Sequence, residues 1–297
     1  MLDRLGPLPA DFVFVEGQRG ALACRGSDRE ALLRAGFTPD GRRDEERLAD
    51  AVESGREPLG RLVVDGTDVL VRRFSHGGLA RAVTGRRFKD PARPFEELRL
   101  SERLRALGIR TPRVIAARAV RAAGPGFELS VVVERVDGTI DIGRLMGDVR
   151  AGRAPKGALR RAVADAGALV GALHRAGFLH ADLQPANLLV TRAGPRGAIV
   201  LDLDRSRFVP QGPLPGDLAA SNLARLWRHV RRREQRYGAA LTSGDRALFL
   251  ARYGVPRGDI EDLAAQIDRA ADRAGIAHRL GWWLESRVGR GEDARAR

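Results

Sequence analysis

The chain has 297 residues, 43% of them hydrophobic, and its 52 Lys and Arg against 38 Asp and Glu give a net charge of +14. This predicts a globular protein of one large domain or two packed lobes, and the single cysteine, Cys24, excludes a disulfide framework and a cysteine-rich metal site. The only lysines, Lys89 and Lys156, lie outside any Gly-Lys-Ser/Thr sequence, which excludes a phosphate-binding P-loop.

Short strands separated by glycines are the pattern of the first 136 residues. Pro94–Leu107 differs, because its apolar residues recur at helical spacing and stop before Gly108, which predicts a helix. A charged surface helix is expected over Thr38–Ser54, and Gly124-Pro125-Gly126 predicts the turn of an antiparallel hairpin. The expected strands are Phe12–Val15, Ala21–Cys24, Arg61–Val64, Asp68–Phe74, Val114–Val120 and Leu129–Val136.

Helical spacing dominates after Asp137-Gly138. The one interruption is a second predicted hairpin, in which Leu188–Thr191 and Ala198–Leu203 flank a Gly-Pro-Arg-Gly turn. The expected helices are Leu159–Arg175, Leu218–Arg236, Ser243–Tyr253 and Ile260–Ala274.

These patterns predict an α+β protein with two lobes. Residues 1–136 form an N-terminal antiparallel sheet lobe with one key helix, and residues 137–288 form a mainly helical C-terminal lobe. The charged residues 289–297 are expected to be disordered.

Three oxygen-bearing side chains around the second hairpin have the chemistry of phosphoryl transfer. Asp182 follows a predicted helix, Asn187 lies five residues later, and Asp202 ends the second strand of the hairpin. Phosphoryl transfer needs a group that positions the attacking hydroxyl and oxygen ligands for divalent cations. A carboxylate and an amide oxygen are suitable Mg²⁺ ligands, and the hairpin is expected to bring Asn187 close to Asp202.

The alternative is purely structural. His180 would then be a packed core histidine, Asp182 a cap and Asn187 a turn residue. The hairpin that follows and the presence of Asp202 favour the catalytic interpretation.

The sequence His180-x-Asp182-x-x-x-x-Asn187 with a downstream Asp-Leu-Asp resembles the protein-kinase-like fold. The chain is most similar to the lipopolysaccharide core kinases that phosphorylate 3-deoxy-D-manno-octulosonic acid (Kdo). Two variants point to that group: Arg-x-x-x-x-Gly-Gly-Leu over Arg72–Leu79, and Asp-x-Asp-Arg over Asp202–Arg205. The resemblance covers roughly residues 60–230 and includes Val69–Leu79, Phe95–Leu100, Gly108–Arg113, His180–Asn187, Leu201–Arg205 and Asn222–Leu226.

The resemblance implies an ATP- and Mg²⁺-dependent enzyme with defined roles for five residues. Asp182 is the catalytic base, Asn187 and Asp202 are the magnesium ligands, and Glu97 orients a cation on the third strand. That cation is Arg72, where ordinary kinases have a lysine. A guanidinium can hold a carboxylate and phosphate oxygens in one plane, although its reach differs from that of lysine. A plain surface arginine is the alternative.

Nucleotide contacts are expected from the junction between the lobes. By analogy with a kinase hinge, backbone groups around Glu134 and Val136 meet the adenine. The glycine-rich phosphate cover is weakly marked, since Gly55, Gly60 and Gly66 do not form a Gly-x-Gly-x-x-Gly pattern, and Gly77-Gly78 reads as a backbone turn.

Several departures from protein kinases indicate the class of acceptor. The arginine that precedes the catalytic aspartate in many protein kinases is Ala181, and the lysine two residues after it is Gln184. No Ala-Pro-Glu follows Asp202, and the segment before the next helix is short. A small or glycolipid hydroxyl is therefore favoured over a protein, and the enzyme is expected to need no activating phosphorylation.

The leading hypothesis is a kinase of a Kdo hydroxyl on a lipid A precursor. A heptose kinase of the same group and an aminoglycoside-type phosphotransferase are the alternative enzymes. The non-enzymatic alternative is a kinase-like pseudoenzyme that binds anionic membrane or nucleic acid, although intact Asp182, Asn187 and Asp202 argue against it.

The excess arginine has two explanations, a solvated surface or attraction to a polyanion. The expected partners are the glycolipid substrate and the anionic inner membrane, without nucleic acid or an obligate protein partner. No apolar run is long enough to span a membrane and the first residues lack a signal-peptide core, so we expect a cytoplasmic protein, peripheral at the inner membrane.

Overall fold

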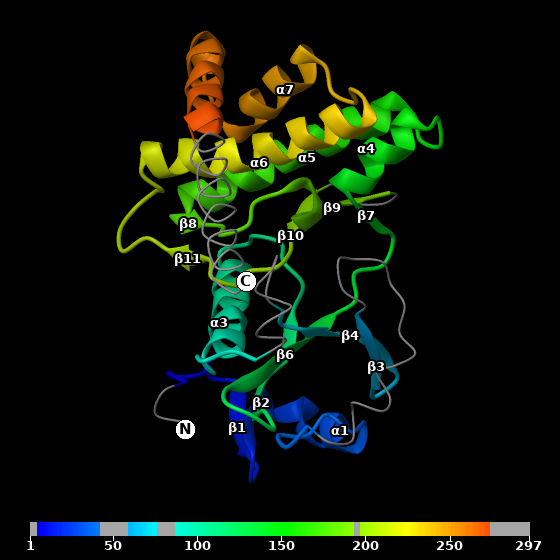
Figure 1. The fold of residues 1–297 in the computed structure, drawn as a ribbon, viewed down its shortest axis with the longest axis vertical. Helices are drawn as coiled ribbons and strands as arrows, with labels where there is room; N and C mark the ends of the chain where they lie inside the picture. Colours follow the sequence, from blue (N-terminus) through cyan, green and yellow to red (C-terminus); the bar gives the residue numbers. More distant parts are fainter. Residues whose placement is uncertain (1–4, 42–58, 76–86, 193–196, 274–297) are drawn as a thin grey trace, which may run out of the picture. The chain divides into compact units, whose positions relative to one another are not determined.

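The computed structural model describes residues 5–41, 59–75, 87–192 and 197–273. The chain forms two compact units, one of Met1–Thr139 with Ile199–Arg207 and the other of Ile140–Ala198 with Phe208–Arg297 (Figure 1). The segment Ile199–Arg207 therefore returns to the first unit after the chain has entered the second.

A six-stranded sheet, antiparallel at every neighbouring pair, is the basis of the first unit. Its strand order is β1-β2-β5-β6-β4-β3. The strands are β1 (Phe12–Glu16), β2 (Gly20–Arg25), β3 (Gly60–Val64), β4 (Thr67–Arg73), β5 (Val114–Arg121) and β6 (Phe127–Glu134). All six strands predicted from the sequence are present, with ends shifted by one or two residues.

The turn between β3 and β4 consists of two residues, Asp65 and Gly66, whose types favour a tight hairpin turn. Asp65 and Gly66 connect the strands with φ angles of 46° and 75°, and Val64 pairs with Thr67 across them. Two consecutive positive φ angles are those of a type I′ turn, which matches the twist of the flanking strands. Gly66 is therefore a turn residue.

Two helices cover opposite faces of this sheet. The helix α3 (Arg93–Ala106) lies beside the sheet (Figure 1). Its Phe95 and Leu98 belong to a core cluster that includes Ala117 of β5. The short helix α1 (Arg29–Arg34) belongs to a second cluster, which contains Ala116. Successive residues of a strand point to opposite faces, so β5 is buried on both sides.

Helices dominate the second unit (Figure 1). They are α4 (Ile142–Arg150), α5 (Lys156–Arg175), α6 (Gly216–Tyr237), α7 (Ser243–Tyr253) and residues 260–273. Divisions between the units fall within three short strands, β7 (Thr139–Asp141), β10 (Ala198–Val200) and β11 (Arg207–Phe208). The strand β9 (Leu188–Thr191) is the middle strand of a sheet β10-β9-β7, and β8 (Phe178–Leu179) pairs with β11.

Helices α5 and α7 approach each other closely at two glycines. A Cβ atom on Gly167 would lie 2.4 Å from the carbonyl oxygen of Phe249, and one on Gly171 would lie 2.2 Å from that of Tyr253. Only residues without a side chain allow this backbone contact. The pair of glycines on α5 thus fixes where α7 lies.

The structure corrects some sequence predictions. The strand predicted over Ala198–Leu203 ends at Val200, so Asp202 lies in the loop beyond it. Helices α1 and α4 were not predicted, α1 because it has only six residues. The start of the helix expected over Thr38–Ser54 is not helical, and residues 42–54 lie outside the described residues, as does the end at 289–297. Within the described ranges, no helix is long and apolar enough to cross a membrane.

Candidate active site

Asp182 lies in the loop between β8 and the single turn Pro185–Asn187. One of its carboxylate oxygens, Oδ2, accepts hydrogen bonds from the buried Gln184 Nε2 and from Asn187 Nδ2, the latter at 3.3 Å. Asn187 Nδ2 also donates to the backbone carbonyl of Asp182 at 2.8 Å. The amide nitrogen of Asn187 is used in these bonds, so its Oδ1 remains as a possible cation ligand.

The other carboxylate oxygen of Asp182 faces a cation. Arg225 of α6 places Nη1 3.7 Å from Asp182 Oδ1, and the two side chains are 42% and 39% exposed. This is an ion pair beyond hydrogen-bond distance, open to solvent on both sides. Asp182 therefore has one oxygen held by two amides and one accessible to a ligand.

Buried polar groups connect the loop of Asp182 to the helices behind it. The backbone N–H of Asp182 donates to His180 Nδ1 at 3.1 Å, and Asn222 Nδ2 of α6 donates to the carbonyl of His180 at 2.7 Å. Asn222 Oδ1 lies 3.1 Å from His174 Nε2 of α5. Because an amide oxygen only accepts, Nε2 of His174 carries the proton.

The tautomer of His174 determines its second contact. Its Nδ1 accepts from the hydroxyl of Tyr253, 2.9 Å away at the end of α7. Burial lowers the pKa of His174 from 6.5 to about 4, against the opposing effect of the Asn222 hydrogen bond. The ring is therefore neutral at physiological pH. Helices α5, α6 and α7 each contribute one side chain to this network.

A second group of charged residues lies in the first unit. Arg72 of β4 donates through Nη2 to Glu97 of α3, and its Nη1 lies 3.2 Å from Asp202 Oδ1. Arg72 is thus shared between two carboxylates, and it also lies over the ring of Phe74. Burial raises the pKa of Glu97 to about 7 against the effect of Arg72, and Asp202 adds to the rise. Burial lowers the pKa of Arg72, but the two carboxylates outweigh it and raise that pKa.

Asp202 has features expected of a cation ligand. Its φ angle is 57°, a left-handed conformation that is unusual for a residue other than glycine and clusters at functional sites. Its Oδ1 is buried and, despite the nearby Arg72 Nη1, has no partner with hydrogen-bond geometry in the part of the chain that the structure describes. A buried anionic oxygen that lacks a hydrogen bond fits the donor chemistry of Mg²⁺.

Asp204, two residues on, has a structural partner. It accepts hydrogen bonds from Arg93 Nε, at 3.0 Å, and from Arg93 Nη2. The same guanidinium lies over the rings of Phe74 and Phe88. The bidentate pair ties the segment after β10 to the start of α3.

Glu134 and Val136, the residues expected to meet the adenine, lie at the end of β6 and just beyond it. The N–H of Glu134 donates to the carbonyl of Arg113 at 2.9 Å, and the carbonyl of Val136 accepts from Thr139 Oγ1 at 2.8 Å. Among the described residues, no acceptor bonds the N–H of Val136. The strand β6 ends at Glu134, two residues earlier than predicted.

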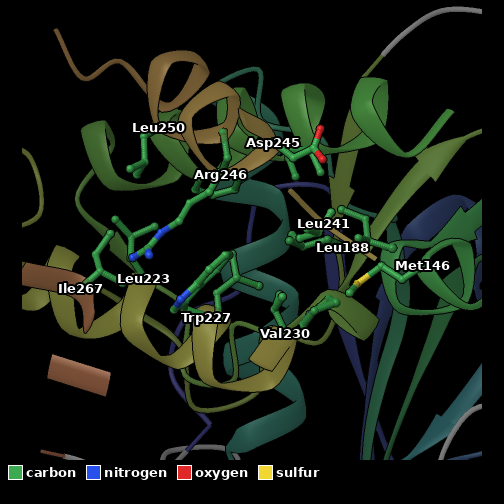
Figure 2. Close-up of a pocket in the computed structure, with 16 residues that line it drawn as sticks. Met146, Leu188, Leu223, Trp227, Val230, Leu241, Asp245, Arg246, Leu250 and Ile267 are labelled. Atoms are coloured by element: carbon green, nitrogen blue, oxygen red, sulfur yellow. The ribbon is translucent and has the colours of Figure 1, made fainter. Parts of the chain in front are cut away.

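An apolar pocket lies within the second unit, and Figure 2 shows side chains that line it. Pro185 and Leu188 contribute to its lining from the loop and β9. The guanidinium of Arg246 lies 4.3 Å from the ring centroid of Trp227, and its Nη1 pairs with Asp268 at 2.9 Å. Other lining residues include Met146, Leu223, Val230, Leu250 and Ile267.

The structure brings the predicted site residues together in two groups. Asp182 and Asn187 are in contact in the second unit, while Arg72, Glu97 and Asp202 are in contact in the first. Because Asn187 and Asp202 belong to different units, their proximity stays a prediction. Within the described residues, no group of three or more His, Cys, Asp or Glu side chains has the arrangement of a metal site. The predictions on Gly55 and Gly77-Gly78 lie outside the described residues.

Sequence reasoning missed some contacts of Asp182. Gln184 and Arg225 both interact with its carboxylate, although the sequence marks Gln184 only as a replacement for a kinase lysine and Arg225 only as a residue of a predicted helix. The bond from Asn222 to the carbonyl of His180 was also missed. No local pattern signals these contacts, since Arg225 and Asn222 are about forty residues from the loop.

Comparison with known proteins identifies the family. Residues 49–253 match the model of the Lipopolysaccharide kinase (Kdo/WaaP) family. The 3-deoxy-D-manno-octulosonic acid kinase of Actinobacillus succinogenes is 27% identical over 186 residues, which are 61% of this chain and 72% of that protein. The enzyme of the same name from Xanthomonas euvesicatoria pv. vesicatoria is 34% identical over 188 residues, 60% of this chain and 69% of that protein.

A solved structure agrees with these matches. It is described as WaaP in complex with acyl carrier protein, and it matches with a TM-score of 0.52 and 25% identity over 77% of this chain and 90% of that chain. The predicted α+β, protein-kinase-like fold is confirmed. The chain belongs to the Lipopolysaccharide kinase (Kdo/WaaP) family and is a phosphotransferase with a hydroxyl acceptor.

Proposed function

We propose that this protein transfers the γ-phosphoryl group of ATP to a hydroxyl of a Kdo residue in the inner core of lipopolysaccharide. The observation that carries the proposal is the carboxylate of Asp182, which Gln184 and Asn187 hold at one oxygen while the other stays accessible. The relatives named Kdo kinase support Kdo as the acceptor sugar.

The chain's own residues account for the reaction as follows. Asp182 Oδ1 accepts the proton of the acceptor hydroxyl, whose oxygen bonds to the γ-phosphorus as the bond to the leaving oxygen of ADP breaks. The products are the phosphorylated acceptor and ADP, and Asp182 then releases the proton to solvent. Gln184 and Asn187 orient the carboxylate for this step.

We propose that the nucleotide binds to the sheet lobe, residues 1–136, and that residues 137–288 provide the catalytic loop. Arg72, held by Glu97, is proposed to bind phosphate oxygens. The N–H of Val136, for which the described residues provide no acceptor, is proposed to bind the adenine close to Glu134. Asn187 Oδ1 and Asp202 would hold Mg²⁺, supported by the unsatisfied oxygen of Asp202. Bound Mg²⁺ would supply charge neutralisation on the phosphates.

A panel of acceptors tests the proposal. ADP release with Mg²⁺ is measured for wild type and Asp182→Asn with Kdo-lipid A, a heptose-extended acceptor, an aminoglycoside and no acceptor. We expect turnover with Kdo-lipid A alone and a loss of about a hundredfold to ten-thousandfold in the variant, the usual contribution of a general base. Turnover with another acceptor would establish the heptose or aminoglycoside alternative. No turnover, with salt-sensitive binding to polyanions, would establish the pseudoenzyme.

The location follows from the substrate. Kdo-lipid A is an anionic glycolipid, and a chain with a net charge of +14 is attracted to an anionic bilayer. We therefore propose peripheral association with the cytoplasmic face of the inner membrane. Sedimentation with vesicles that contain phosphatidylglycerol, at low and high salt, tests this.

An acyl carrier protein is a second candidate partner, although no obligate protein partner was expected from the sequence. The solved WaaP structure is in complex with such a protein. An acyl chain needs an apolar site, so the apolar pocket of Figure 2 is the place in this chain at which to test for one. Affinity purification followed by intact mass analysis would detect the carrier, and Leu223→Gln in the pocket should release it.

A further inference from the structure

One row of arginines on α6 carries more positive charge than the carboxylate near it can balance. Arg225, Arg228 and Arg232 lie at i, i+3 and i+7, on one face. The only carboxylate within ion-pair distance of this row, among the residues that the structure describes, is Asp182. Three cations and one anion leave the row with an excess of positive charge.

Two other arginines of α6 lie close to carboxylates. Arg231 pairs with Asp272 at 3.2 Å, and Arg233 counteracts the burial that raises the pKa of Asp141. Arg228, in the middle of the row, is partly buried. Its burial and the positive charges of Arg225 and Arg232 lower its pKa. Like charges kept close together and partly buried are unfavourable unless an anion joins them.

The position of Arg225 indicates whether that anion belongs to the acceptor or to ADP. Its guanidinium adjoins Asp182 Oδ1, which accepts no hydrogen bond from the described residues and is the oxygen proposed to take the acceptor's proton. The leaving group departs in line, on the far side of the phosphoryl group from the attacking hydroxyl. A ligand of Arg225 therefore belongs to the acceptor and not to ADP. Within the described residues Arg225 makes no hydrogen bond, so its donors are available.

We propose that the row Arg225, Arg228 and Arg232 is an anion subsite for the acceptor, in which Arg225 binds a carboxylate next to the reactive hydroxyl and the other two bind anionic groups further along the same molecule. The inference rests on the proposed function and deepens it. A guanidinium binds a carboxylate or phosphate through paired hydrogen bonds. Arg225 and Arg232 are separated by about 10 Å along the helix, since each residue rises about 1.5 Å.

The subsite discriminates among the candidate acceptors. A Kdo residue has a carboxylate, whereas an aminoglycoside is a polycation that the row would repel. A neutral heptose has no group for Arg225. The charge of the row thus favours an acidic sugar by electrostatics alone.

The test uses an acceptor with a single charge. The methyl glycoside of Kdo and its methyl ester differ only in the carboxylate, and kcat/KM and calorimetric binding are measured for both. The proteins are wild type, Arg225→Gln, Arg225→Lys and Arg236→Gln. Arg236 is a matched control, because it is on the same helix, about 16 Å from Arg225, and contacts the ring of Tyr237.

We expect Arg225→Gln to lower kcat/KM and affinity for the acid about tenfold, as for loss of a charged hydrogen bond. The ester should be unaffected by the substitution, Arg225→Lys should restore part of the loss, and Arg236→Gln should behave as wild type. An equal loss for acid and ester would overturn the inference, because Arg225 would then act on Asp182 or the phosphoryl group. An equal loss in Arg236→Gln would also overturn it, in favour of general surface charge.

Failure of the inference is distinguishable from failure of the proposed function. Turnover of the acid with no selective effect in Arg225→Gln overturns the subsite alone. Binding of the acid that depends on Arg225, together with no turnover of Kdo-lipid A, overturns the proposed function alone. If wild type binds neither the acid nor Kdo-lipid A and turns over neither, both are overturned.

A separate experiment tests Arg228 and Arg232, because membrane lipids also carry anionic groups that these two arginines could bind. Arg228→Gln/Arg232→Gln is assayed on Kdo-lipid A in detergent and for binding to phosphatidylglycerol vesicles without acceptor. We expect a raised KM for Kdo-lipid A and unchanged vesicle binding. Lost vesicle binding with an unchanged KM would assign these two arginines to the membrane and overturn their part in the subsite.

Discussion

The side-chain amide of Asn222 donates a hydrogen bond to the backbone carbonyl of His180 over 2.7 Å. The bond connects the N-terminal third of α6 to the chain two residues before Asp182. Because Asn222 also accepts from His174, one buried side chain couples two helices to the loop of Asp182.

Asn222→Asp separates the donor role of this residue from its acceptor role. The carboxylate still accepts from His174, but it can no longer donate to His180 and places negative charge against that carbonyl. We expect kcat to fall about tenfold or more with little change in the KM for ATP, measured by ADP release. Unchanged kcat in a folded Asn222→Asp protein would contradict a positioning role.

His174 predicts a pH dependence of stability. Its pKa is lowered from 6.5 to about 4 by burial, so between these values the unfolded chain binds more protons than the folded one. The stability linked to His174 is complete above about pH 6.5 and is lost as the pH falls toward 4, by about 3 kcal/mol in total. His174→Gln lacks this titration.

The measurement is urea unfolding of wild type and His174→Gln at several pH values. At pH 7 we expect wild type to be more stable, because the variant loses the hydrogen bonds to Asn222 and Tyr253. The difference should shrink toward pH 4.5. A difference that is the same at pH 7 and pH 4.5 would show that His174 does not titrate as described.

Gly171→Ala should destabilise the second unit. The added Cβ would lie 2.2 Å from the carbonyl oxygen of Tyr253, so α7 must move away from α5. We expect a loss of roughly 3 kcal/mol in thermal or urea unfolding, typical of an overpacked contact. Gly157→Ala, near the start of the same helix, is the control. It meets only the flexible end of Arg161 at 3.5 Å and should gain up to about 1 kcal/mol. Equal stabilities of Gly171→Ala and Gly157→Ala would contradict this prediction.

Arg72→Lys tests the shared guanidinium. Arg72 reaches Glu97 with one terminal nitrogen and Asp202 with the other, and a lysine has a single nitrogen. We expect kcat/KM for ATP to fall about tenfold to a hundredfold, the range for loss of a charged hydrogen bond. Arg61→Lys, in an exposed pair with Asp68, is the control and should retain activity. Full activity of Arg72→Lys would contradict this account, because it would show that a lysine at position 72 supports catalysis as well as the arginine does.

Much of the sheet and the loop chemistry could be predicted from the sequence. The strands of the first unit were found because glycines delimit alternating apolar residues, and Asp65-Gly66 encodes its own turn. The pair Asp182 and Asn187 was recognisable because both residues lie in one short loop with fixed spacing. In each case, residues adjacent in sequence determine the geometry.

Only the tertiary structure determined which side chains meet these residues. Arg225 and Asn222 reach the loop of Asp182 because α6 packs behind it. Asp202 has its left-handed backbone and its contact with Arg72 only because residues 199–207 return to the first unit. Local sequence encodes strands, turns and short loops through neighbouring residues. The charge balance around a carboxylate instead depends on packing between segments far apart in the chain, which no local pattern specifies.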